Sequence, residues 1–464
     1  MIAGAEAVSS PRRQDSEALP APLRLILVLS GGIILYVLII LNFDIYKDSL
    51  HLYTYKISFH IENIPVSIAL ICIVSAIFSL SIPKHQSVIG MFSHLVYIII
   101  FIPLCSIYTI MDGDIYFLLI CSLSISICYL IFGRQKYLSS NSEKTNFDKF
   151  IFLVFSSALL INLVIMVVNG DIVLNFVSFN DVYRLRSAAA HGEAPIASRW
   201  TTIIAYTASS YVIIYGLNRR NIISLVIGSA NLYILYNSYG YKLFIFFIFL
   251  NIGLYLFYKL RNPYLLLYSI IILMALSNIF YFFGTPYVHS IMNYIDELII
   301  RRYFYVPGYM SYAWFDTFKE YPYIYMSNEF MVKEFIKYPL DINHSLFVAR
   351  NIFGMDFNPN TNFMAYGFAN FGYIGVIIYS LIVYSSFLFV DVISYKTGSS
   401  YLRLGALAPA TLFLEADPLV VLISFGFGFI LIISLAARLL AMGERREILI
   451  RALPKRRIQG RPGR

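Results

Sequence analysis

The sequence has few charged residues. Asp, Glu, Lys and Arg make up 13% of its 464 residues, whereas hydrophobic residues make up 59% and aromatic residues 17%. Soluble domains carry roughly 25% charged residues, so this composition excludes an ordinary water-soluble globule. Apolar runs of about 20 residues, long enough to cross about 30 Å of hydrocarbon as a helix, recur along almost the whole sequence. We therefore expect an all-α, polytopic membrane protein.

Cysteine is also scarce, and none of it has the spacing of metal ligands. The four cysteines all lie inside apolar runs, at Cys72, Cys105, Cys121 and Cys128. We interpret them as small buried hydrophobic residues. The sequence has no carboxylate pair or histidine cluster with ligand spacing and no glycine-rich phosphate loop. We expect neither a metal nor a cofactor.

Twelve apolar stretches are candidate membrane spans, of which the eleventh is short. They are Leu23–Asn42, Ile64–Ile82, Val88–Met111, Ile115–Phe132, Phe150–Val168, Trp200–Leu217, Ile222–Tyr236, Leu243–Tyr258, Tyr264–Phe283, Gly367–Val390, Leu404–Leu414 and Leu419–Ala437. The first is long for a signal-peptide core and no cleavage site follows it. The expected organisation is an N-terminal segment 1–22, a transmembrane domain 23–437 and a basic tail 438–464, lying on anionic lipid.

The distribution of basic residues predicts the orientation. With the N-terminus in the cytoplasm, 23 of the 35 Lys and Arg residues fall on the cytoplasmic side. The short inner loops 218–221 and 258–261 are strongly basic for their size. Because the net charge of +9 is dispersed over such loops, membrane orientation explains it better than nucleic-acid binding does. Both termini are predicted to face the cytoplasm.

Two outer loops are long, at 169–199 and 284–366. The second is rich in aromatic residues, which suggests short helices lying in the membrane interface, along Met310–Lys319 and Asn328–Lys337. The spans themselves carry almost no charge, and Glu415 and Asp417 are expected at an outer boundary. Ion-coupled transporters usually keep ionisable groups at mid-membrane, so the function is expected at the outer face.

Cations on the outer side oppose the insertion bias, so each needs an explanation. Guanidinium groups bind phosphate oxygens in bidentate fashion, and a cluster of them at the interface is suited to a lipid diphosphate. The candidate diphosphate-binding residues are Arg184, Arg186, Arg199, Lys242, Arg301, Arg302 and Arg350. Two of them have simpler interpretations. Snorkelling explains Lys242, and a surface ion pair with Asp181 or Glu193 explains Arg186.

A proton acceptor is also expected on this face. His344 is the candidate, since histidine is the usual acceptor near neutral pH. A single loop histidine is more often structural or solvated, and His191 and His289 are further outer histidines. The carboxylates of Asp316, Glu320 and Glu329 are rival bases or partners for the arginines.

Four stretches resemble motifs of the O-antigen and related oligosaccharide repeat-unit polymerases (Wzy-type). The segment 360–378, with Asn360-Thr361-Asn362-Phe363 followed by Gly367-Phe368-Ala369-Asn370-Phe371-Gly372-Tyr373-Ile374-Gly375, is similar to the family signature. The other three, in chain order, are Val182–Arg186, Gly240-Tyr241-Lys242, and Arg301-Arg302 with Val306-Pro307-Gly308. The resemblance extends from about Phe150 to Val390.

The resemblance implies a GT-C-like membrane glycosyltransferase without a metal or nucleotide. Such an enzyme moves a growing glycan from undecaprenyl diphosphate onto the next lipid-linked repeat unit, at the periplasmic face of the bacterial inner membrane. It further implies Arg301 and Arg302 as catalytic residues beside His344, the remaining cations as diphosphate ligands, and Asn360 and Asn362 as sugar ligands. Its partners would be lipid-linked glycans, membrane lipids and a chain-length regulator protein, without nucleic acid.

Two alternatives stay open. An O-antigen ligase similarly has about twelve spans and a basic outer loop, but transfers glycan to lipid A core. A lipid-linked oligosaccharide flippase would need a charged central cavity instead. The sequence identifies neither the sugars, nor their linkage, nor whether the polymer ends as O-antigen, capsule or exopolysaccharide.

Overall fold

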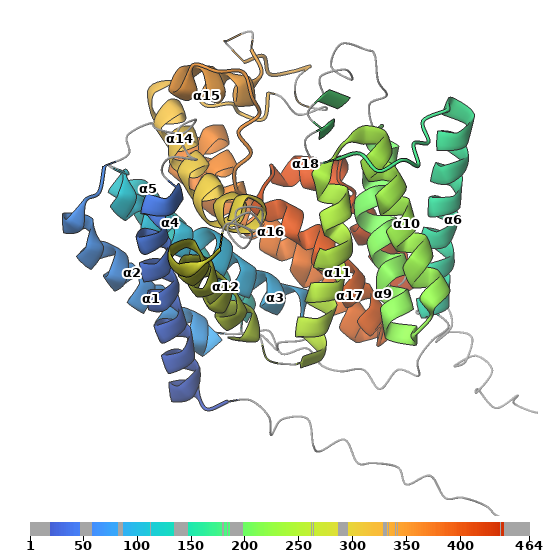
Figure 1. The fold of residues 1–464 in the computed structure, drawn as a ribbon, viewed down its shortest axis with the longest axis horizontal. Coiled ribbons are helices and arrows are strands. Elements are labelled where there is room, and N and C mark those ends of the chain that lie inside the picture. Colours follow the sequence, from blue (N-terminus) through green and yellow to red (C-terminus); the bar gives the residue numbers. More distant parts are fainter. Residues whose placement is uncertain are drawn as a thin grey trace, which may run out of the picture.

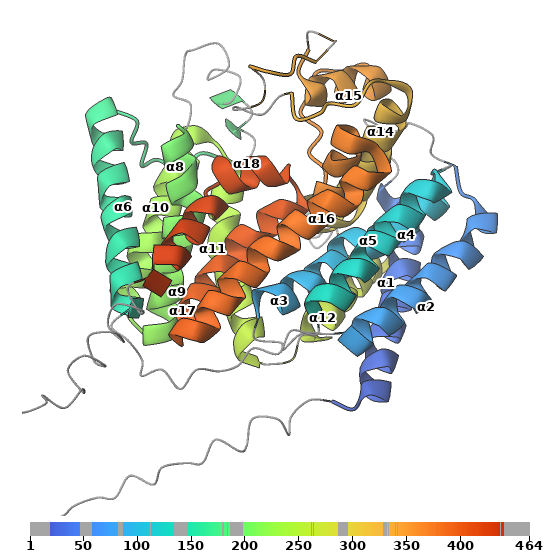
Figure 2. The same cartoon turned by 180° about the vertical axis from the view of Figure 1, so that it is seen from behind.

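The computed structural model of the chain is a bundle of helices (Figures 1 and 2). It describes residues 19–46, 58–81, 87–111, 113–133, 147–178, 181–182, 184–185, 198–260, 262, 264–285, 296–327, 332, 334–338, 340, 342–436 and 438–439. Among these residues there are helices and no strand.

The N-terminal half of the bundle consists of α1 (Ala21–Tyr46), η3 (Ile61–Asn63), α2 (Ile64–Ser81), α3 (Val88–Leu95), η4 (Val96–Phe101), α4 (Ile102–Ile110), α5 (Ile115–Gly133), α6 (Phe147–Asn169), α8 (Arg199–Ile203), η5 (Ile204–Ala208) and α9 (Ser209–Arg219). The second half consists of α10 (Ile222–Tyr239), α11 (Lys242–Leu260), α12 (Tyr264–Phe283), η6 (Asp296–Tyr305), α14 (Val306–Glu320), α15 (His344–Phe353), α16 (Phe363–Thr397), α17 (Ser400–Ala410), η7 (Thr411–Leu414) and α18 (Pro418–Ile423).

Nine helices of the described part are long and apolar enough to cross a membrane, which is the architecture of a multi-pass membrane protein. They are Ala21–Phe43, Ile61–Ser81, Val88–Ile110, Ile115–Gly133, Asp148–Asn169, Ile222–Tyr239, Lys242–Leu260, Tyr264–Phe283 and Phe363–Thr397. The all-helical, polytopic fold class is thereby confirmed. The other three predicted spans fall on shorter or more polar segments: α8 to α9, α17 with η7, and α18 with the helix Phe427–Ala436. The count of twelve remains a prediction.

Polar contacts tie neighbouring connections together at each end of the bundle. At the end opposite α15 (Figure 1), Asp148 of α6 lies 3.8 Å from Arg219 of α9 and accepts a hydrogen bond of 2.6 Å from Ser399. At the α15 end, Lys319 at the end of α14 forms an ion pair of 2.6 Å with Asp114, which precedes α5. Ion pairs that are partly exposed contribute little to stability. These contacts show which segments lie next to each other at each end of the bundle.

The span Val88–Ile110, formed by α3, η4 and α4, lies at the centre of the first half and is buried throughout. Its N-terminus is held by Asp391 of α16, whose carboxylate accepts the backbone N–H groups of Val88 at 2.9 Å and Ile89 at 3.1 Å. Away from water these donors need a protein acceptor, and the helix dipole favours an anion at this end. The helix α16 therefore supplies a hydrogen-bond acceptor that the buried N-terminus of α3 needs.

The first helix expected in the long outer loop, Met310–Lys319, is present as the greater part of α14 (Val306–Glu320). It packs beside α4, α15 and α16 (Figure 1). Trp314 and Tyr312 are almost fully buried, and the Trp314 indole N–H donates to the carbonyl of Pro359 at 2.9 Å. The middle of α14 is therefore part of the packed core, whereas Lys319 and Glu320 at its C-terminal end are exposed.

The second expected interfacial helix, Asn328–Lys337, is absent in its described residues, which form turns and irregular backbone. The helix of this region is α15 instead. Asn343 caps its N-terminus by accepting the N–H groups of Ser345 and Leu346, and Gly354 ends it at φ +65°. These are ordinary start and stop signals, so the sequence did contain the correct boundary.

The helix α16 is broken near its start, at Phe371 and Gly372. Gly372 has φ +63° and ψ −149°, a conformation that is almost restricted to glycine. The chain folds back there, because a Cβ on Gly367 would lie 2.4 Å from the carbonyl oxygen of Gly375. The predicted span Gly367–Val390 is thus a short helix and a long one, which packs beside α5 and α17 (Figure 2).

Candidate functional site

A cavity of about 850 Å³ lies between the predicted outer segments and the helix bundle. Its wall combines residues from α8, α11, α18, the start of α15 and the first part of α16. The volume is typical of sites for organic ligands. Of the predicted site residues, four line this cavity: Arg199, Arg302, His344 and Asn360.

Two arginines and two carboxylates give the cavity its charge. Arg302 lies on η6 and Arg199 is the first residue of α8, after the N-cap Ser198. Glu415 and Asp417 stand in the short connection between η7 and α18. Asp417 is buried and caps α18 by accepting the N–H of Leu419 at 2.8 Å.

Glu415 is in a different situation from Asp417. Burial raises the pKa of its carboxyl, and the attraction of Arg302 partly opposes this shift. Leu412 and Leu419 are apolar residues of the same cavity wall. Glu415 and Arg302 therefore line the same cavity close enough for the cation to attract the carboxylate.

His344 is buried, with 2% of its surface exposed. Its Nε2 lies 3.5 Å from the Ser327 hydroxyl, and its ring packs against Tyr338 with centroids 4.5 Å apart. Burial lowers the pKa of the imidazole to about 4. The side chain is neutral at pH 7 and a weaker base than an ordinary histidine.

The wall beside His344 is held in a strained conformation by Asn370. Tyr325 and Met326 have φ values of +49° and +60°, which non-glycine residues rarely adopt. The Asn370 side chain accepts the N–H of Met326 at 2.7 Å, and the Ala369 carbonyl accepts the N–H of Ile324 at 2.8 Å. The end of the short α16 helix thus fixes this loop at the cavity.

Two other motifs meet at a neighbouring corner. Gly240 lies between α10 and α11 at φ +68°. A Cβ on Gly240 would lie 3.1 Å from the Leu185 side chain and 3.4 Å from the Val182 carbonyl, so this glycine lies against Val182 and Leu185. Tyr241, the next residue, lines the cavity. Arg184 and Lys242 are near this corner in sequence, although neither lines the cavity itself.

The remaining predicted residues lie elsewhere. Arg301 is half-buried on η6 and lies outside the cavity wall. Arg350 is exposed and forms an ion pair with Asp356, in which its Nη2 lies 2.9 Å from Oδ2. Asn362 is buried as the N-cap of α16 and donates to Ser311 at 2.7 Å, so its side chain has a structural use. Arg186, His191, His289 and Glu329 lie outside the described residues.

Sequence reasoning did not assign a site role to Glu415, Asp417 or Asn370. The signal for the two acids was present, because charged residues beside apolar spans are rare and usually functional. Asn370 stood inside the recognised signature, but its contact with Met326 joins positions 44 residues apart and has no sequence pattern.

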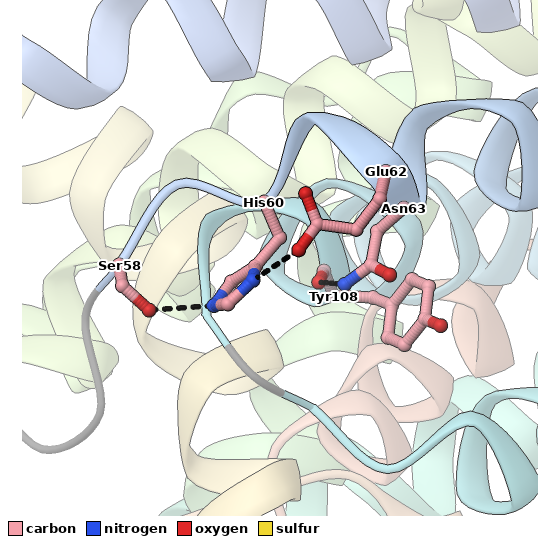
Figure 3. Close-up of polar contacts among 5 residues, drawn as sticks. All are labelled: Ser58, His60, Glu62, Asn63 and Tyr108. Carbon is pink, nitrogen blue, oxygen red and sulfur yellow. Dashed lines mark hydrogen bonds and ion pairs between the residues drawn. The ribbon is translucent and has the colours of Figure 1, made fainter.

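A second polar cluster lies at the start of α2 (Figure 3). The Ser58 hydroxyl is 2.6 Å from His60 Nε2, and His60 Nδ1 is 2.9 Å from Glu62. This order resembles an activated serine nucleophile. None of the three residues lines the large cavity, and the segment is pinned to the end of α4 by backbone bonds from Ser58 to Ile110 and from His60 to Thr109. We interpret it as a structural connection.

The described residues contain no group of three or more His, Cys, Asp or Glu side chains that could hold a metal ion. Comparisons with protein-family models, with curated proteins and with solved structures find no match for this chain.

Proposed function

We propose that this chain is a membrane glycosyltransferase that polymerises undecaprenyl-diphosphate-linked repeat units at the periplasmic face of the bacterial inner membrane. One observation carries the proposal. Three of the four stretches that resemble the polymerase family, far apart in sequence, contribute Tyr241, Arg302, Asn360 and Asn370 to the wall of one cavity, and the fourth lies against Gly240.

The cavity chemistry suits a lipid diphosphate and a sugar. Arg302 and Arg199 supply guanidinium groups for the phosphate oxygens, with Arg184 and Lys242 at the approach. Asn360, exposed on the cavity wall, supplies an amide for sugar hydroxyls. We leave Arg301, Arg350 and Asn362 out of the binding site.

The proposed reaction requires no covalent intermediate with the protein. A sugar diphosphate already carries a good leaving group, so positioning the acceptor hydroxyl and neutralising the charge on the departing diphosphate are the main requirements. Twelve spans and cytoplasmic termini belong to this proposal, since they turn the α15 end, and the cavity near it, toward the periplasm.

Reconstitution tests the proposal. The purified chain in liposomes, given one defined lipid-linked repeat unit, is expected to form products of two or more repeats, resolved by mass. A ligase would require lipid A core as acceptor, and a flippase would move the lipid without forming a bond. Absence of elongation by well-folded protein would contradict the proposal.

Two arginine variants sharpen the test. Arg302→Gln removes a guanidinium from the cavity and is expected to lower the rate by about 10²–10³, the size of the loss when one charge-stabilising donor is removed. Arg350→Gln is the matched control, because Arg350 is exposed and paired with Asp356. Equal losses in both variants would exclude a specific role for the cavity.

A further inference from the structure

The inference concerns which group accepts the proton released in the proposed reaction. Among the described residues that line the cavity, only two are carboxylates, Glu415 and Asp417. The outer-loop acids considered from sequence, Asp316 and Glu320, are not part of its wall. Asp417 is occupied in capping α18, whereas the Glu415 carboxylate accepts no hydrogen bond from a described side chain or backbone group.

The backbone around Glu415 is rigidly placed. The 3₁₀ helix η7 ends at Leu414, and the N–H of the next residue, Glu415, donates to the Leu412 carbonyl at 3.2 Å. Pro418 then starts α18. Phe413 and Leu414 beside it are almost fully buried. A short connection anchored on both sides in the core presents its side chain with little freedom, as a reacting group requires.

The two candidate bases have been shifted in opposite directions. Desolvation raises the pKa of Glu415 above its usual value of 4.5. Desolvation lowers the pKa of His344 to about 4. Since a general base is most effective with a pKa near the operating pH, the carboxylate is the better proton acceptor of the two.

We propose that Glu415 is the catalytic base of the glycosyl transfer, taking the proton of the acceptor hydroxyl while Arg302 beside it stabilises the departing diphosphate. This inference depends on the proposed function. The acceptor oxygen forms a bond to the anomeric carbon, the bond from that carbon to the diphosphate oxygen breaks, and the diphosphate leaves with the electron pair. The proton moves to the Glu415 carboxylate, so atoms and charge balance without another reactant.

Arg302 and Glu415 line the same cavity. The positive charge of Arg302 favours the ionised form of Glu415 and so opposes the effect of its burial. The titratable and charged groups around Glu415 are Arg302, which attracts the carboxylate, and Tyr303, whose ionised form it repels. Arg199, Asp417 and the neutral His344 lie in the same cavity wall.

The experiment uses the reconstituted chain and one defined lipid-linked repeat unit. Glu415→Gln keeps the shape of the protonated side chain but cannot accept a proton. We expect its kcat to fall about 10²–10⁴-fold with KM within about threefold of the wild type. The matched control is Glu320→Gln, since Glu320 is an exposed carboxylate on α14 outside the cavity; it is expected to retain the wild-type rate.

The outcomes separate the two proposals. If the wild type does not elongate the repeat unit, the proposed function fails before any variant is compared. If the wild type elongates and folded Glu415→Gln keeps more than about a tenth of its kcat, Glu415 is not the base and only this inference is overturned.

A pH profile protects the test against misfolding of the variant. The wild-type kcat is expected to rise with pH to a plateau, with an apparent pKa above 4.5 that is absent from the residual activity of Glu415→Gln but retained by Glu415→Asp. A wild-type kcat that stays constant between pH 4.5 and 8 would overturn the assignment.

Discussion

At the scale of single residues, the cavity combines two arginines and two carboxylates with one uncharged imidazole. Arg302 and Glu415 influence each other across the cavity wall, whereas His344 is buried between Ser327 and Tyr338. Sequence alone pointed to Arg302 and His344 by residue type, but could not rank them, because burial and neighbours decide the protonation of each group.

The lowered pKa of His344 predicts how stability depends on pH. Its folded-state pKa of about 4 lies below the ordinary 6.5, so the unfolded chain binds more protons between these values. This residue's contribution, on the order of 3 kcal/mol, is therefore complete above pH 6.5 and lost as the pH falls toward 4.

The measurement is the midpoint of thermal unfolding in detergent from pH 7 to 4. His344→Gln is expected to reduce the fall in the midpoint over this range, because glutamine does not titrate. The comparison with the wild type at each pH cancels the contributions of the other titrating groups. A slope unchanged by the substitution would show that His344 is not responsible.

The cluster at Ser58 gives a second residue-scale prediction. Ser58→Ala removes a hydroxyl that lies 2.6 Å from His60 but outside the cavity. We expect elongation activity within about twofold of the wild type and a loss of stability of about 1 kcal/mol or less, as for an exposed hydrogen bond. Loss of activity with retained folding would instead identify Ser58 as a nucleophile.

At the scale of helices, the family-like signature describes a bend. Gly367 and Gly375 allow two backbone segments to touch, and Gly372 provides the turn. In the sequence these glycines stand in an apolar run, and such a run is equally consistent with one uninterrupted membrane span. Tertiary packing, rather than any local pattern, decides that α16 breaks after Phe371.

Alanine at Gly372 tests the bend. Gly372→Ala forces a side chain into φ +63°, ψ −149°, and its Cβ would approach the Tyr323 hydroxyl to 2.8 Å. We expect a loss of about 1–3 kcal/mol in stability together with loss of elongation activity. Gly253→Ala in α11 is the matched control, since nothing lies within 4 Å of the added Cβ. It is expected to be neutral or slightly stabilising. A neutral Gly372→Ala would contradict the bend.

At the scale of the whole molecule, hydropathy predicted the nine long spans well, because length and apolar character are local properties. The aromatic stretch predicted a helix over Met310–Lys319, which α14 contains, but not the burial of its rings against neighbouring helices. Hydropathy missed α15, for which the Asn343 and Gly354 caps were informative. Which segments surround the cavity was beyond prediction, since those contacts span the chain from Arg199 to Phe425.

The predicted orientation has a direct test. In a cysteine-free background, a membrane-impermeant maleimide is expected to label Met355→Cys, at an exposed position after α15, in cells with a permeable outer membrane. Asn221→Cys, in the turn between α9 and α10, is expected to react only after the inner membrane is opened. The reverse pattern would place the cavity in the cytoplasm.

The central span Val88–Ile110 also has a consequence for biogenesis. Its N-terminal amides are capped by Asp391, a residue synthesised about 300 positions later. Since chains emerge N-terminus first, α3 stays uncapped and partly uncovered until α16 has inserted. A ribosome-bound chain that ends before Asp391 should therefore be sensitive to membrane proteases and become resistant once α16 has been translated.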